Sequence, residues 1–428
     1  MLKRVEKQNL KDLKDACVLA KDAKFPSPFD SKLEFSCSAR GPWNIVHTGM
    51  LIPQAHEVYV CAQSCLRGVV LTAAEMNAID RFSNIIVREN NILEGNTEDL
   101  IVEGMGDILE KLPYTPRAIL VYTSCIHHFI GCDLNLVYKR LREKYPNVEF
   151  TDCYMNPIMR KSGLTPDQLM RRQLYSLLDK QDLDSKSVNI IGNNLKTDDD
   201  SELVKIIREN GFTLREVPRT KTYDEYKEMG KAFLNITYNP AAIEAGRYLE
   251  EKLGQKHLYL PLSYGFDEIE KTLDTLCENL GIEKIDFTSN KKQALDALKK
   301  AKEVIGGTPI EIDYTLTLRP ASLARLLLEN GFNVVSIYED CFAGEEEEDF
   351  KWIQENYPNL KIYATVHVKM RFVNRKRDEK LLALGQKAAY FTGSNNFVNI
   401  IEGGGMYGFS GIIKLCDLMI DAFLNEKD

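Results

Sequence analysis

Short runs of β-branched and apolar residues alternate with longer amphipathic segments along almost the whole chain. This alternation is typical of βαβ units, in which parallel strands are covered by helices on both faces of a sheet. The sequence therefore predicts an α/β fold with parallel sheets. The expected strands cover residues 58–61, 84–87, 118–122, 149–152, 188–191, 234–237, 310–314, 333–338 and 361–365.

Segments with helical periodicity lie between these strands, with apolar residues three and four positions apart. Three of the segments are followed by Gly211, Gly254 and Gly331, and glycine readily adopts the left-handed conformation that often ends a helix. A strand-like run at 212–214 follows the first of these glycines, and the acidic run 345–349 is expected to be the solvated start of a helix. The expected helices cover residues 134–144, 165–178, 200–210, 241–253, 321–330 and 349–355.

The chain has 428 residues, more than one hydrophobic core normally holds, and this length suits two or three domains. We expect three α/β modules, over residues 1–183, 184–302 and 303–428. The first junction is a polar segment at 182–187, and the third module opens near the turn sequence Ile-Gly-Gly-Thr-Pro-Ile. The first module holds seven of the ten cysteines.

Charge and hydropathy exclude two classes of function. The formal net charge is −8, which argues against electrostatic binding of nucleic acid. No apolar run reaches the roughly 18 residues of a membrane-spanning helix, and segment 1–24 is charged throughout, without the apolar core of a signal peptide. We therefore expect a cytoplasmic protein, in which cysteines are buried thiols or metal ligands rather than disulfides.

Five cysteines of the first module lie in three separate segments, mostly where an expected strand ends and a loop begins: Cys37, Cys61, Cys65, Cys125 and Cys132. Loops at strand ends can bring distant thiolates together, and such groups bind soft metals or iron–sulfur clusters. Cys125 follows a strand and precedes an expected helix, and a helix N-terminus favours the thiolate form. We predict that Cys37, Cys65 and Cys125 bind metal, with Cys61 and Cys132 as further candidates.

Zinc is the alternative metal, with Cys125, His127, His128 and Cys132 as its ligands. Against zinc, the chain lacks paired Cys-x2-Cys ligands, and adjacent histidines point in different directions. The sequence also has no P-loop, no Gly-x-Gly-x-x-Gly after a strand and no Gly-x-Ser-x-Gly elbow. The remaining cysteines are expected only to fill space: Cys17, Cys153, Cys277, Cys341 and Cys416.

Three segments, in this order, resemble the nitrogenase component 1 family. They are Cys37 followed by Gly41, the loop after His56 with Cys61 and Cys65, and the run Thr-Ser-Cys-Ile-His-His-Phe-Ile-Gly-Cys-Asp-Leu that contains Cys125. Similar segments at 234–254 and 405–419 extend the resemblance over nearly the whole chain. The family includes molybdenum–iron protein subunits, light-independent protochlorophyllide reductase and nickel-sirohydrochlorin a,c-diamide reductive cyclase.

The resemblance implies three Rossmann-like domains around a shared cleft and an iron–sulfur cluster held by the first-domain cysteines. Four thiolates of one chain would complete a [4Fe-4S] cluster, whereas three shared across a two-fold interface would hold a larger bridged cluster. The resemblance also implies a homodimer, or a pair with a related component 1 subunit, that receives electrons from a separate ATP-hydrolysing iron-protein reductase. We therefore expect a nitrogenase-like oxidoreductase whose substrate binds in the cleft. Candidate cleft residues are Arg160, Lys161, Arg319, Lys369, Arg371 and Asn395.

Two positions depart from the family pattern. Asn239 stands where the family's catalytic subunit has its cofactor cysteine, and Val398 stands near the position of its cofactor histidine. We therefore expect no iron–molybdenum cofactor of the usual ligation. The missing ligands favour an alternative function, a non-catalytic scaffold or carrier for the assembly of a metallocluster or tetrapyrrole. A binding protein with incidental cysteines is the third hypothesis.

Overall fold

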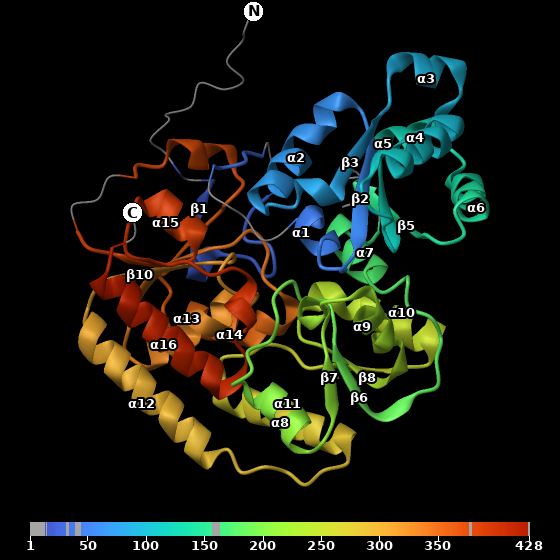
Figure 1. Ribbon diagram of the computed structural model, residues 1–428. Coiled ribbons are helices and arrows are strands. Elements are labelled where there is room, and N and C mark those ends of the chain that lie inside the picture. The colour runs from blue at the N-terminus through green and yellow to red at the C-terminus, as the bar shows by residue number, and fades with distance from the viewer. Residues whose placement is uncertain are drawn as a thin grey trace, which may run out of the picture. The chain divides into compact units, whose positions relative to one another are not determined.

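The structure is a computed structural model that describes residues 13, 15–30, 34–38, 44–155, 163–375 and 379–426. Within these residues the strands form one six-stranded and two four-stranded sheets (Figure 1). The chain divides into two compact units. The central unit comprises residues 43–196 and 207–260 and holds both four-stranded sheets. The terminal unit comprises residues 1–42, 197–206 and 261–428 and holds the six-stranded sheet.

The first sheet of the central unit has the strand order β3-β2-β4-β5, and all its strands are parallel. Every residue of β2 and β4 is buried, as expected for strands covered on both faces. The predicted parallel α/β architecture is thus confirmed. The strands are β2 (Ala55–Cys61), β3 (Phe82–Ile86), β4 (Ala118–Ser124) and β5 (Glu149–Met155).

Helices cover the two faces of this sheet because side chains alternate between faces along each strand. Val58 and Val121 pack into a cluster with apolar side chains of α4 and α6. Tyr59 and Tyr122 point to the other face, where their rings stack with centroids 4.3 Å apart and pack with side chains of α1, α2 and α7. The helices of this region are α1 (Ile45–Gly49), α2 (Leu66–Glu75), α3 (Glu89–Glu94), α4 (Thr97–Lys111), α5 (Cys125–Ile130), α6 (Leu134–Lys144) and α7 (Pro166–Gln173).

The second sheet of the central unit is also parallel, with the order β7-β6-β8-β9. Helix α10 ends at Gly254, which has a φ of 74°, as predicted for a helix C-terminus. The elements are β6 (Asp184–Ile190), β7 (Thr213–Arg215), α9 (Tyr223–Lys227), β8 (Ala232–Thr237), α10 (Ile243–Leu253) and β9 (Lys256–Tyr259), and α8 (Glu202–Glu209) begins in the terminal unit.

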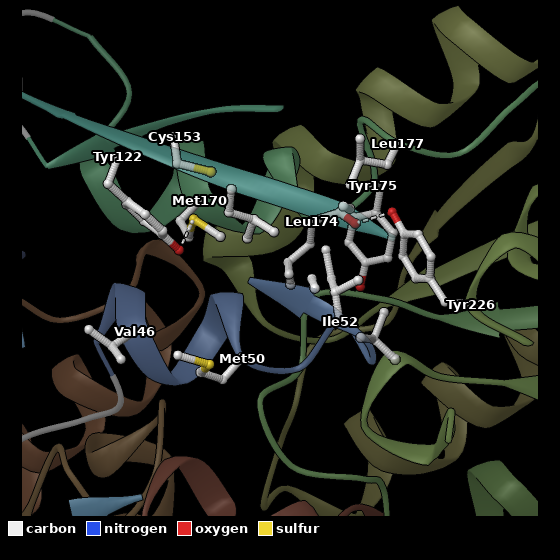
Figure 2. Close-up of a cluster of buried hydrophobic side chains, with 14 of the residues drawn as sticks. Val46, Met50, Ile52, Tyr122, Cys153, Met170, Leu174, Tyr175, Leu177 and Tyr226 are labelled. Carbon is white, nitrogen blue, oxygen red and sulfur yellow. Dashed lines mark hydrogen bonds between the residues drawn. The ribbon is translucent and has the colours of Figure 1, made fainter. Parts of the chain in front are cut away.

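One buried cluster joins the two sheets of the central unit through α7 and the residues that follow it (Figure 2). On the side of the first sheet, the Tyr122 hydroxyl lies 3.3 Å from the Met170 sulfur. On the side of the second sheet, the Tyr226 hydroxyl donates to the Leu174 carbonyl oxygen at 2.6 Å. The Gly192 N–H, just after β6, donates to the Tyr175 hydroxyl at 2.6 Å. The two sheets therefore share one hydrophobic core.

The sheet of the terminal unit has the order β1-β12-β11-β10-β13-β14 and is parallel except for β1, which pairs antiparallel to β12. Helices α12 and α16 pack side by side (Figure 1). The elements are β1 (Cys17–Leu19), α11 (Phe266–Leu280), α12 (Thr288–Ile305), β10 (Pro309–Asp313), α13 (Pro320–Glu329), β11 (Asn333–Tyr338), α14 (Glu347–Asn356), β12 (Lys361–Tyr363), β13 (Leu382–Leu384), α15 (Gln386–Thr392), β14 (Phe397–Val398) and α16 (Gly408–Leu424).

All the expected strands and helices are present, although their boundaries differ by a few residues. The sequence did not predict β1, β9, β13 and β14, because runs of two to four residues carry no readable periodicity. No helix among the described residues combines the length and the apolar character needed to cross a bilayer.

The expectation for the acidic run was wrong in part. A helix, α14, does begin there, but Glu346 and Asp349 are buried. The Glu346 carboxylate accepts the Ala321 N–H at 2.7 Å, at the start of α13. Burial raises the pKa of Glu346 to about 7. This side chain therefore serves the fold and not the solvated surface.

Gly192 has both a left-handed conformation and no room for a side chain. Its φ is 84°, and an added Cβ would lie 2.0 Å from the Ala242 Cβ. We expect Gly192→Ala to destabilise the protein by about 2–4 kcal/mol, since left-handed strain and overpacking add. Thermal or urea unfolding followed by circular dichroism measures this loss.

Gly211→Ala is the matched control. Gly211 has a similar φ of 75°, but an added Cβ would meet nothing within 4 Å. It should cost only the strain, roughly 1 kcal/mol. Equal losses for the two variants would show that the contact with Ala242 does not limit residue 192.

Candidate functional site

Three candidate thiols of the central unit lie at one edge of its first sheet. Strands β2 and β4 are parallel neighbours with Val60 opposite Thr123, so their carboxyl ends reach the same edge. Cys61 is the last residue of β2, and Cys125 is the first residue of α5, directly after β4. Cys65 ends the short 3-10 helix Gln63–Cys65 and precedes α2. The segments that carry these three cysteines therefore begin at the same edge of the sheet, whereas Cys37 belongs to the other unit.

Cys61 and Cys65 differ in their surroundings. Cys61 is fully buried and packs in the cluster that contains α1 and α2. Burial, with a smaller contribution from nearby Cys65, raises the pKa of the Cys61 thiol to about 12. Cys65 is exposed, and Cys125 is half-buried. Cys65 and Cys125 are thus the accessible thiols of this edge, whereas Cys61 resembles the tail of a core strand.

Cys132 lies on the other face of the sheet. It packs against the cluster formed by α4 and α6, whereas Cys61 belongs to the cluster on the opposite face. Burial raises the pKa of its thiol to about 11, with smaller contributions from the neighbouring Thr97 and Glu98. The structure therefore does not bring Cys132 together with Cys61.

Cys37 belongs to the terminal unit, where it is buried beside a lysine. The Lys387 Nζ donates to the Cys37 sulfur at 3.3 Å and lies 5.7 Å from the centre of the Tyr314 ring. Burial alone would lower the pKa of Lys387, but Tyr314 and Cys37 raise it above its ordinary value. The Cys37 sulfur thus has a cationic hydrogen-bond donor, which stabilises negative charge on it.

The described residues form no complete metal site. Among them, no three His, Cys, Asp or Glu side chains converge to hold a metal ion, whether zinc or iron. The His127 ring is buried, and its Nδ1 lies 3.2 Å from the Ser124 backbone N–H. Cys65 and Cys125 are of the ligand type that iron–sulfur clusters use, but a cluster would need further ligands beyond these two.

The predicted cleft residues have different fates. The buried Arg319 guanidinium bonds to Glu268 at 2.9 Å and to Asp349 at 3.2 Å, so it is committed to internal ion pairs. The Lys369 ammonium is also buried and pairs with Asp15 at 3.0 Å. The other four divide into two exposed residues, Arg371 and Asn395, and two that lie outside the described residues, Arg160 and Lys161.

Carboxylates of the chain itself fill three helix N-termini in the terminal unit, a feature that sequence reasoning missed. Asp313 accepts the Ala388 N–H of α15 at 2.5 Å, and Glu202 accepts the Ser410 N–H of α16 at 3.1 Å. Glu346 does the same for α13. Such N–H groups bind phosphate in nucleotide-binding folds. Here they are satisfied internally, and no sequence motif announces these pairings.

The two departures from the family pattern are built into the fold. The Asn239 side chain is buried and accepts the Ala241 N–H at 3.0 Å, at the start of a 3-10 helix. Val398 is buried in β14. Neither side chain is a metal ligand of the usual kind.

The parallel sheets and their covering helices define the chain as an α/β protein. The sequence profile of the nitrogenase component 1 type oxidoreductase family matches residues 46–421, and the chain belongs to that family. Members are generally oxidoreductases that bind iron–sulfur clusters, and they typically pair with an iron-protein reductase and form multimers.

Solved structures share the fold at low sequence identity. "Nitrogenase Cp1 at pH 6.5" superposes with a TM-score of 0.64 at 14% identity and covers 92% of this chain and 95% of its own. "Nitrogenase Cp1 at pH 5" gives 0.61 at 13% identity, with coverages of 96% and 94%. No protein of curated function matches the sequence significantly.

The contrast between Cys61 and Cys65 predicts unequal reactivity in iron-free protein. Because pH 8 lies far below the raised pKa of about 12, the Cys61 thiol stays protonated at this pH. Iodoacetamide should therefore modify it slowly. The exposed Cys65 should react at least tenfold faster, roughly like an accessible thiol. Peptide mass spectrometry after timed alkylation measures both rates.

Two other cysteines calibrate this measurement. Cys341 is exposed and should be modified early, whereas buried Cys153 should resist modification. Cys61 modified as fast as Cys65, with Cys153 still protected, would contradict the assignment of Cys61 to the core.

Proposed function

We propose that this protein is the electron-accepting component of a nitrogenase-like oxidoreductase. It would receive low-potential electrons from an ATP-hydrolysing iron-protein reductase through an iron–sulfur cluster and pass them to a substrate. Membership of the nitrogenase component 1 type family, together with thiols at the carboxyl edge of the first sheet, supports this proposal. The bound cluster would supply one-electron transfer.

We propose Cys37, Cys65 and Cys125 as ligands of the cluster. Cys65 is preferred to Cys61 because it is exposed at the end of the loop, whereas the Cys61 thiol is buried in the strand. Lys387 donates a hydrogen bond to the Cys37 sulfur and so would help to position it. Cys132 is the weakest candidate, because it packs on the face of the sheet that α4 and α6 cover, opposite to the face of Cys61.

A subunit interface near this edge is part of the proposal. Leu93 on α3 is 81% exposed and Phe129 on α5 is 69% exposed, and these helices follow β3 and β4 at the same edge as the thiols. Burial of these two side chains by a second subunit would remove their apolar surface from water. We propose that a second copy of the chain, or a related component 1 subunit, covers them.

The reductase would dock at the N-terminal ends of α2 and α5, next to Cys65 and Cys125. The sequence predicted loops here, but Arg67 lies in α2 and both histidines lie in α5. Arg67 and His128 are exposed, whereas His127 is buried and unavailable for docking. An exposed charge beside the cluster suits a transient electrostatic contact.

A non-catalytic scaffold or carrier is the second candidate function. Asn239 and Val398 favour it, because they replace side chains that would hold a catalytic cofactor. Electron consumption separates the two functions. With reductase, ATP and dithionite, a scaffold would consume no electrons in response to substrate, whereas an oxidoreductase would.

The proposed ligands predict the iron content of variants. Anaerobically purified protein should hold about four iron atoms per chain, as one [4Fe-4S] cluster does. Cys65→Ala and Cys125→Ala should each lose most of that iron, since each removes a thiolate ligand. Iron analysis with a colorimetric chelator measures the content.

Cys277→Ala and Cys416→Ala are the matched controls, because both thiols are buried in helices of the terminal unit and should leave iron unchanged. Loss of iron from Cys61→Ala but not from Cys65→Ala would transfer the ligand role to Cys61. Stoichiometric zinc in colourless protein would overturn the iron–sulfur proposal.

The docking proposal predicts faster ATP hydrolysis by the reductase when this protein is present, because electron transfer completes the reductase cycle. Arg67→Glu should reduce this stimulation severalfold, because it reverses a charge on the proposed docking surface at the start of α2. Arg247→Glu, at an exposed position on α10, should not. Light scattering must show the same oligomeric state for the wild type and both variants. If Arg67→Glu stimulates ATP hydrolysis as strongly as the wild type does, the reductase docks elsewhere.

A further inference from the structure

A separate cavity lies at the carboxyl edge of the same sheet, beyond Cys125. Its volume is about 420 Å³, within the usual range for sites of small molecules. Its walls come from the end of β4, α5 and the turn after it, the end of β5, and α7. The lining residues are Thr123, Ser124, His127, His128, Gly131, Cys132, Leu134, Tyr154 and Leu169.

Two buried polar atoms of this lining have no partner. His127 is 2% exposed and Ser124 is 3% exposed. Neither the His127 Nε2 nor the Ser124 Oγ makes a hydrogen bond to any described residue. Leaving such groups unpaired costs roughly 1–3 kcal/mol each, so a molecule that bonds to them gains affinity.

The tautomer of the His127 ring decides whether its Nε2 is a hydrogen-bond donor or an acceptor. The Ser124 N–H donates to the His127 Nδ1 at 3.2 Å, and the Ser124 carbonyl oxygen lies 3.3 Å from the same nitrogen, so either tautomer has a backbone partner. The shorter contact favours the tautomer that has the lone pair on Nδ1, and our proposal takes that tautomer. In a neutral imidazole the proton is then on Nε2, which becomes a donor. The free group of His127 is therefore an N–H that lacks an acceptor.

We propose that this cavity binds a small uncharged organic molecule through a carbonyl oxygen, or an equivalent acceptor, that receives the His127 Nε2–H. The Ser124 hydroxyl is the second donor available to the same oxygen. The proposal concerns binding alone and holds whether or not the protein carries a cluster.

The described part of the lining favours an uncharged ligand. Among the described residues it contains no Asp, Glu, Lys or Arg, so these walls offer no counter-charge to a buried charge. Leu134, Leu169 and the Tyr154 ring supply apolar walls instead.

Cyclohexanone is a suitable probe, and methylenecyclohexane is its match in shape without the acceptor oxygen. Saturation-transfer NMR with the full-length protein should detect binding of cyclohexanone but not of methylenecyclohexane. His127→Phe removes the donor and keeps an aromatic ring, so it should weaken cyclohexanone binding about tenfold, the value of one hydrogen bond. Leu136→Ala, at an exposed position on α6 outside the cavity, should leave binding unchanged.

Two further measurements guard against misfolding of His127→Phe. Leu169→Trp keeps both donors but fills the cavity, and it should also abolish binding. Long-range ¹H–¹⁵N spectra of the wild-type histidines, assigned with His127→Phe, should show the Nε2–H tautomer for His127 and a shift of that signal when cyclohexanone is added. The Nδ1–H tautomer, equal binding of both probes, or binding that survives Leu169→Trp would each overturn the proposal.

Discussion

The parallel pairing of β2 with β4 is the constraint on which the proposed site depends. Because Val60 lies opposite Thr123, both strands end at one edge, and the segments that carry Cys61, Cys65 and Cys125 must start there. The same pairing places the unpartnered polar atoms of Ser124 and His127 at that edge. An antiparallel pair would send the two segments to opposite ends of the sheet.

The two units bury polar groups in different ways. In the central unit, Glu57 is buried between the hydroxyls of Tyr59 and Tyr122, and burial raises its pKa well above the ordinary value. The two tyrosine hydroxyls donate hydrogen bonds to this buried carboxyl group. In the terminal unit, carboxylates such as Asp313 meet helix N-termini, where aligned N–H groups stabilise negative charge. In the central unit, the two tyrosines belong to the same hydrophobic cluster as Cys61. In the terminal unit, the carboxylates occupy helix N-termini where an external anion would otherwise bind.

Much of the fold could be predicted from the sequence, because strand and helix periodicity are local properties. The match for α6 is complete at both ends, since an amphipathic segment and its flanking polar residues define it. The site was predictable only in part. Strand-end positions identified Cys65 and Cys125 as candidates. The burial of Cys61, and the packing of Cys132 on the opposite face of the sheet, depend instead on helices that are distant in sequence. The same holds for Lys387 beside Cys37, a pair 350 residues apart.

The sequence by itself determined the α/β class, the order of strands and helices, and the family, because these follow from periodicity and from short ordered segments. Only the tertiary structure decided which face of the sheet each thiol occupies and that Arg319 is held by Glu268 and Asp349 rather than exposed. The cavity beside His127 was likewise visible only in the tertiary structure. The physical reason is that burial and hydrogen-bond partners are properties of packed neighbours, and packing brings together residues whose separation along the chain carries no signal.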